Sequence, residues 1–76
     1  MAIHEMRTMG SSGDTKLLWD SEQDAEVDNA RRTFNDLRAR GYTAFAVRKG
    51  GEKGAQVREF DPEAESLIMV PQIAGG

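Results

Sequence analysis

The sequence lacks the residues from which many functional sites are built. Its 76 residues contain no cysteine and a single histidine, His4. Disulfides and thiolate metal sites are therefore excluded, and one imidazole cannot form a zinc site by itself. The sequence accordingly predicts neither a cofactor nor a set of metal ligands.

Long apolar segments are also missing. Apolar runs such as residues 67–70 cover four residues, whereas a helix that crosses a bilayer needs about 20. The first ten residues, MAIHEMRTMG, lack the charged start and apolar centre of a signal peptide. We therefore expect a cytoplasmic protein without a membrane partner.

No set of side chains suits catalysis. A nucleophile needs a neighbouring base and a group that orients this base, and the serines lie in predicted loops or caps. The segment RKGGEKG, residues 48–54, has glycines and lysines without the spacing of a phosphate-binding loop. The sequence therefore predicts a protein that is not an enzyme.

The net charge of −3 hides a segregation along the chain. Residues 14–28 carry a net charge of −5, residues 31–58 carry +6 and residues 59–65 carry −4. Part of this pattern is ordinary helix electrostatics, with acids at the start and bases at the end. The alternative is a basic face for an acidic protein partner. Nucleic acid is disfavoured, because the aromatic residues are not interleaved with the bases. The candidate basic face consists of Arg31, Arg38, Arg48, Lys49 and Lys53.

The segment DSEQDAEVDNARRTFNDLRARG predicts an amphipathic helix of roughly residues 22–40. Asp20 or Ser21 can cap its start, with Gln23 or Asp24 reaching back, and Gly41 can adopt the left-handed conformation after its last turn. Four apolar residues recur at steps of three and four and should lie on one side. These are Val27, Ala30, Phe34 and Leu37.

Short β-prone segments flank this helix. TKLLWD precedes it, and YTAFAVRK, AQVREF and SLIMV follow it, while AIHEMRT is a weaker fifth candidate. GSSGD and GGEKG provide hairpin connections, and in FDPEAESL Asp61 can cap one helical turn. We expect the helix to pack on sheet residues that include Leu17 or Leu18, Phe45, Val57 and Ile68. The predicted fold is a single α+β domain over residues 1–76, with one amphipathic helix on a four- to five-stranded mixed or antiparallel sheet.

The tail LIMVPQIAGG, together with the order of hairpin, helix and further strands, resembles the β-grasp fold of ubiquitin and of the small sulfur-carrier proteins. The resemblance implies a β-grasp-like domain, an extended tail over residues 71–76 and a non-enzymatic carrier or modifier. It also implies that an activating enzyme adenylates Gly76, with Gly75 as its required companion. Pro71 would end the strand and Ile73 would give the partner an apolar contact.

A second resemblance remains open. GDTKLLWD, FDPEAESLIMVP and the closing Gly-Gly are similar to small uncharacterised phage and prophage proteins. This resemblance implies a capsid, tail or decoration protein of a virion that binds neighbouring subunits. Under this alternative the tail is packed against a subunit, and its carboxylate has no chemical role.

Overall fold

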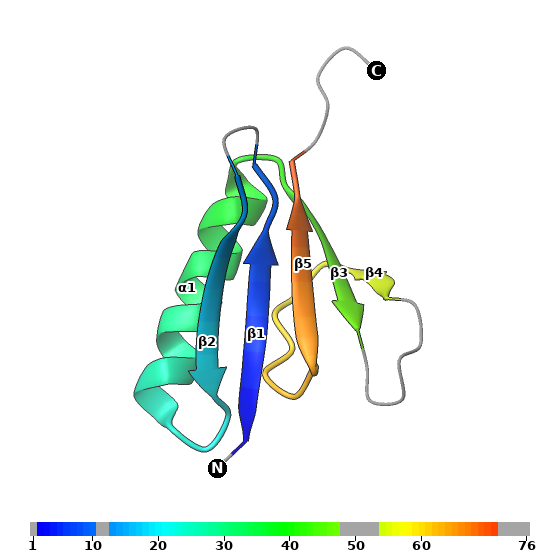
Figure 1. Ribbon diagram of the computed structural model, residues 1–76. Helices are drawn as coiled ribbons and strands as arrows, with labels where there is room; N and C mark the ends of the chain where they lie inside the picture. The colour runs from blue at the N-terminus through cyan, green and yellow to red at the C-terminus, as the bar shows by residue number, and fades with distance from the viewer. Residues whose placement is uncertain (1, 11–12, 48–53, 72–76) are drawn as a thin grey trace.

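The chain forms one helix and five strands in the computed structural model, which describes residues 2–10, 13–47 and 54–71. In chain order they are β1 (Ile3–Thr8), β2 (Thr15–Asp20), α1 (Asp24–Ala39), β3 (Thr43–Val47), β4 (Ala55–Val57) and β5 (Ser66–Val70) (Figure 1). The predicted α+β class, with one amphipathic helix on a mixed sheet, is confirmed.

The strands form one sheet in the order β2-β1-β5-β3-β4. β1 and β5 are parallel, and the other three neighbouring pairs are antiparallel. Parallel neighbours need a long crossover connection, and here the connection from β1 to β5 contains β2, α1, β3 and β4. The last strand of the chain therefore lies in the centre of the sheet.

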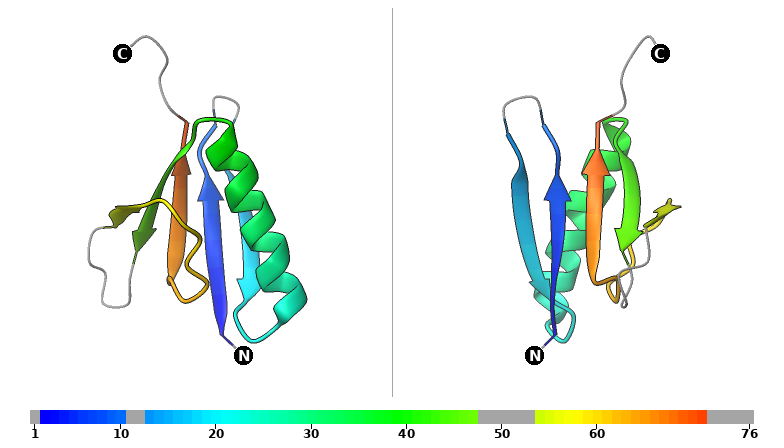
Figure 2. Two further views of the ribbon diagram at one scale, coloured as in Figure 1. Left: turned by 180° about the vertical axis from the view of Figure 1, so that it is seen from behind. Right: turned by 45° about the vertical axis from the view of Figure 1, so that its right-hand side comes forward.

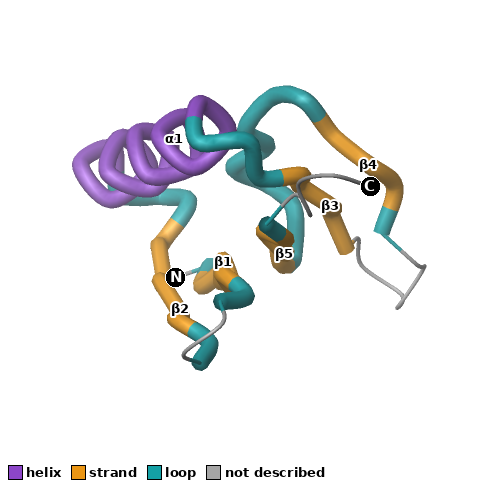
Figure 3. The backbone as a smooth tube through the Cα atoms, turned by 90° about the horizontal axis from the view of Figure 1, so that it is seen from above, coloured by secondary structure: helices purple, strands orange, loops and turns teal. Residues whose placement is uncertain are grey.

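α1 lies on one face of the sheet (Figure 2). The connection from β4 to β5 passes over the same face, and the view from above in Figure 3 shows no described element on the opposite face. We call this opposite side the open face. The core lies between α1 and the covered face.

The helix buries the predicted side, since Ala30, Phe34 and Leu37 are buried and Val27 packs against them. Its start differs from the prediction, because the N-cap is Gln23 and no side chain caps it. β2 extends to Asp20, so Asp20 and Ser21 cannot cap α1. The Asp20 carboxylate instead accepts the N–H of Glu22 at 2.9 Å in the turn that leads into the helix.

The end of α1 agrees with the prediction. Gly41 follows the C-cap with φ of 98°, in the left-handed region. Its N–H donates to the carbonyl of Arg38, and the N–H of Tyr42 donates to the carbonyl of Leu37, both at 3.0 Å. These two bonds form a Schellman motif, which satisfies carbonyls that the helix leaves unpaired.

Two of the predicted sheet partners of the helix are wrong. Phe45 and Ile68 lie opposite each other across β3 and β5 on the open face, and Leu17 rather than Leu18 packs against the core. Turning Phe45 and Ile68 inward would need a one-residue slip, which would expose their neighbours. Val57 packs against the core as predicted. The buried apolar residues of the sheet are Met6, Trp19, Ala44, Ala46, Leu67 and Met69.

β1 and β4 also differ from what the sequence led us to expect. β1, the weakest candidate in the sequence, is a six-residue strand that pairs on both sides. β4 ends at Val57, because Phe60 turns toward the core and packs on Trp19 and Phe34. Asp61 caps a turn rather than a helix, since its carboxylate accepts the N–H of Glu63 at 3.0 Å.

Candidate functional site

The base of the predicted tail lies at the centre of the sheet. β5 pairs with β1 and β3, and beyond β1 the N–H of Met9 still donates to the carbonyl of Met69 at 2.9 Å. Pro71 follows directly and is half-buried. The predicted tail residues Ile73, Gly75 and Gly76 lie outside the described residues. β5 therefore ends directly before Pro71 and is held on both sides (Figure 1).

Two members of the predicted basic face lie within the described residues. Arg31 and Arg38 are seven positions apart and share one side of α1. Arg31 pairs with Asp28 at 3.1 Å and lies 5.8 Å from the ring centre of Phe60. Arg38 donates to the carbonyl of Tyr42 at 3.2 Å. Arg48, Lys49 and Lys53 lie outside the described residues, so the basic face stays a prediction.

The open face carries an apolar surface that the sequence analysis did not identify. We call Phe45, Val47, Ile68 and Val70 the open-face strip. Phe45 and Val47 on β3 are paired with Ile68 and Ser66 on β5, and Val70, at the end of β5, is 36% exposed. The strip runs along β3 and β5 up to Pro71. The alternation of side chains along a strand would have predicted the strip if it had been known which face of β3 is buried.

Charged residues separate this strip from the edge of the sheet. Glu5 and Arg7 on β1 form an ion pair with a distance of 2.7 Å, and the hydrogen bond from Arg7 lowers the pKa of Glu5. Beyond this pair, Leu18 on β2 is 55% exposed and Ile3 on β1 is 52% exposed. The open face thus has an apolar strip over β3 and β5 and a smaller apolar pair beside β2.

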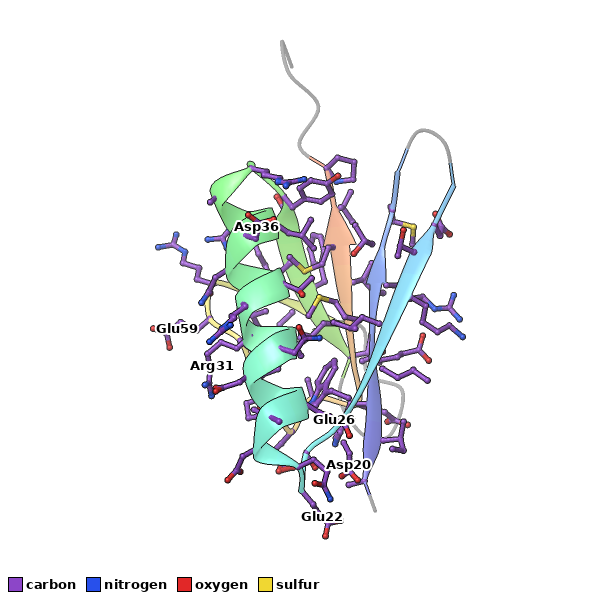
Figure 4. The ribbon with its side chains drawn as sticks, turned by 90° about the vertical axis from the view of Figure 1, so that its left-hand side faces the viewer. Asp20, Glu22, Glu26, Arg31, Asp36 and Glu59 are labelled. Carbon is purple, nitrogen blue, oxygen red and sulfur yellow. The ribbon has the colours of Figure 1, made fainter. Side chains whose placement is uncertain are left out.

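The fold brings two acidic segments together at the end of the molecule where α1 begins. The indole Nε1 of Trp19 donates to the carbonyl of Pro62 at 3.2 Å, and Nδ1 of His4 lies 2.6 Å from the carbonyl oxygen of Ala64. These bonds tie residues 61–65 to β1 and β2. Figure 4 shows Asp20, Glu22 and Glu26 gathered at this end.

Asp20 has a structural role that the sequence did not indicate. Its side chain is only 8% exposed and accepts the N–H groups of Glu22 at 2.9 Å and Ala2 at 3.3 Å. The bond from Glu22 is the main cause that lowers the pKa of Asp20, and the bond from Ala2 adds to it. Glu26 accepts the N–H of Asp20 at 3.1 Å. The two carboxylates thus fix the junction of β1, β2 and α1.

Two hollows occur near these segments. One, of about 340 Å³, is lined by Ala2, Ile3, His4, Glu63 and Glu65. The other, of about 530 Å³, is shallow and is lined by residues 57–62. Within residues 2–10, 13–47 and 54–71, no group of three histidine or acidic side chains is arranged to hold a metal ion. Within the described residues, neither hollow is therefore lined by a group of side chains that could hold a metal ion.

His4 serves the fold at this end of the molecule. Its ring stacks on Trp19 and its Nδ1 binds Ala64, while Nε2 is buried without a hydrogen-bond partner. Because a carbonyl can only accept, Nδ1 carries the proton in this contact. Trp19 is 1% exposed and belongs to the core.

Comparisons with family models, curated proteins and solved structures found no match. No helix within the described part of the chain has the length and apolar character needed to cross a membrane. The functional argument therefore depends on the geometry of the chain itself.

Proposed function

We propose that the chain is a non-enzymatic, ubiquitin-like carrier or protein modifier that is activated at the carboxylate of Gly76. The observation that carries this proposal is the position of Pro71 at the end of the central strand β5. Proline has no N–H, so the ladder of hydrogen bonds cannot continue through it. The sequence after Pro71 therefore starts from a firmly held base.

The open-face strip supports the same proposal. Exposed apolar surface that is contiguous marks sites of protein association more often than isolated apolar residues do. Phe45, Ile68 and Val70 lead along β3 and β5 to Pro71. An activating enzyme that docks on the strip would lie beside the start of the tail, and Ile73 would extend the apolar contact.

The chemistry needs no catalytic side chain from this protein. A carboxylate oxygen of Gly76 attacks the α-phosphorus of ATP, and pyrophosphate leaves. A sulfur or amine nucleophile then attacks the carbonyl of the acyl adenylate, and AMP leaves. Glycine suits both terminal positions, because an extended backbone without Cβ atoms fits a narrow cleft.

The experiment that tests the proposal is an activation assay. The chain ending at Gly76 is incubated with Mg²⁺, ATP and purified activating enzymes of the ubiquitin and sulfur-carrier types, and the acyl adenylate is detected by intact-mass spectrometry. We expect Gly76→Ala to slow adenylation without changing Tm, and deletion of Gly75 and Gly76 to abolish it. Gln72→Ala is the matched control in the tail. Absence of adenylate with every enzyme contradicts the proposal.

A virion subunit is the second candidate, and the open-face strip favours it too, because an apolar surface serves assembly whatever the tail does. Under this alternative the glycine variants leave assembly intact. Ile73→Asp then weakens assembly through the loss of buried apolar contact. Gly76→Ala therefore separates the two candidates, because it impairs adenylation under the first and leaves assembly intact under the second.

A further inference from the structure

β2 forms an open edge of the sheet. It pairs with β1 on one side, and no described strand pairs with it on the other. The N–H of Ser21 donates to Ala2 next to β1, so by alternation the N–H and carbonyl groups of Lys16, Leu18 and Asp20 point away from β1. At Asp20 the outward N–H binds the Glu26 carboxylate. The outward N–H and carbonyl groups of Lys16 and Leu18 therefore form the part of this edge to which a further strand could bind.

The side chains beside the edge leave apolar area uncovered. Leu18 and Ile3 are the two most exposed large apolar side chains among the described residues, at 55% and 52%. Ile3 lies opposite Asp20 and is therefore a diagonal neighbour of Leu18 on the open face. A strand added to β2 would cover the edge and contact Leu18, whereas Ile3, on β1, lies one strand further from it.

The charge pattern of β2 indicates which strand fits. An antiparallel strand with a residue opposite Leu18 places its next outward residues opposite Lys16 and Asp20. The complementary strand therefore needs a basic residue, an apolar residue and an acidic residue at alternate positions. The segment Lys16-Leu17-Leu18-Trp19-Asp20 has this pattern itself.

We propose that β2 pairs with β2 of a second copy, antiparallel and with the twofold axis at Leu18. Each Lys16 then lies opposite the partner's Asp20, and the two Leu18 side chains lie opposite each other. Opposite charges that face each other across strands stabilise pairing, whereas like charges oppose it. Together the two copies form a continuous ten-stranded sheet.

Lys16 also selects the register. A lysine on an edge strand generally opposes edge-to-edge association. In a register centred on Lys16 the two lysines would lie opposite each other. In a register centred on Leu17 each Lys16 would lie opposite the partner's Leu18. Asp20 is the one acidic residue of β2, so among pairings of β2 with itself only the register centred on Leu18 gives both lysines an acidic partner.

Glu26 limits the strength of this pairing. Its carboxylate occupies the N–H of Asp20, which in the dimer faces the carbonyl of the partner's Lys16. When two copies pair, the carbonyl of the partner's Lys16 replaces the Glu26 carboxylate as the acceptor of the Asp20 N–H in each copy. The dimer is therefore reversible and depends on protein concentration.

The experiment is sedimentation velocity of the full chain from micromolar to millimolar concentration. Leu18→Pro removes an outward N–H, a position where an edge strand tolerates proline, and should abolish the dimer. Lys16→Glu should raise the dissociation constant about tenfold, because it creates two like-charged pairs. Arg58→Glu is the matched control, with the same charge change next to β4 at the opposite edge of the sheet, and should leave the dimer intact. Glu26→Ala should tighten it.

Cross-linking provides a readout that does not depend on affinity alone. The natural chain has no cysteine, so Leu18→Cys introduces one thiol at the twofold axis. We expect fast disulfide formation between two copies of Leu18→Cys and slow formation with Val70→Cys, which is exposed on the same face over β5. A monomer at every concentration, equal rates for both cysteine variants, or weaker association of Glu26→Ala would overturn the proposal. Circular dichroism confirms that each variant is folded.

Discussion

The imidazole of His4 stacks on the indole of Trp19, with ring centres 5.3 Å apart and ring planes inclined by 16°. Each ring also forms a hydrogen bond with the segment between β4 and β5. His4 Nδ1 binds the carbonyl of Ala64, and Trp19 Nε1 donates to the carbonyl of Pro62. The two residues are neighbours across β1 and β2, and their backbone partners lie 60 and 43 positions away in the chain. This pair therefore joins the first hairpin to the connection that leads into β5.

His4→Ala removes both the stack and the bond to Ala64, and we expect it to lower the free energy of unfolding by about 2 kcal/mol. His4→Phe keeps an aromatic ring against Trp19 and should cost only about 1 kcal/mol. Urea denaturation at neutral pH measures both values. Equal losses for the two variants would show that the stack contributes nothing.

Phe34→Ala should cost about 3–5 kcal/mol, because the side chain is fully buried and touches Phe60. A loss of this size unfolds most of the population of a small domain. Phe45→Ala is the matched control, since Phe45 is half-buried on the open face, and it should cost about 1 kcal/mol. Thermal denaturation followed by circular dichroism compares them. A cooperative Phe34→Ala variant with parental stability would refute the packing of α1.

Asp20 makes stability depend on acid pH. Its pKa in the folded chain is lowered from the ordinary value of 3.8, mainly by the N–H of Glu22, so the ionised form is favoured by folding. Its contribution is complete above the unfolded pKa and is lost as the pH falls through the folded pKa. Asp20→Asn should be less stable than the parent at pH 7, and the difference should close below about pH 4. Denaturant midpoints from pH 7 to pH 2 test this, and a constant difference would contradict it.

Arg31→Glu combined with Arg38→Glu tests the predicted basic face. In the activation assay we expect a lower kcat/KM at low salt and a weaker dependence on ionic strength, because charge steers association. The control combines Arg32→Glu with Arg40→Glu, which changes the charge equally on residues that point away from this side of α1. Equal effects of the two pairs would indicate that only net charge matters.

The helix could be predicted from the sequence because its signals are local. The three- and four-residue spacing of Val27, Ala30, Phe34 and Leu37 sets one side of α1, and Gly41 marks its end. The start was less well defined, since Asp20 suits both a cap and a strand end. Its assignment to β2 depends on pairing with Ile3, seventeen residues earlier.

Which face of a strand is buried was decided by the tertiary structure. In TAFAV and in LIMV both alternating sets are apolar, so periodicity does not distinguish the face with Ala44 and Met69 from the face with Phe45 and Ile68. The pairing of β3 with β5 under α1 makes this choice. The open-face strip is its direct result, and so sequence analysis missed it.

The sequence alone determined the amphipathic helix, the glycine that ends it and the charge segregation, because each depends on residue type and short spacing. Only the tertiary structure placed β5 between β1 and β3, gathered the two acidic segments around His4 and Trp19, and left β2 at an open edge. These features depend on contacts between residues up to 61 positions apart, such as Glu5 and Ser66. Their free energy comes from shared burial and strand pairing, which no local segment possesses before the chain folds.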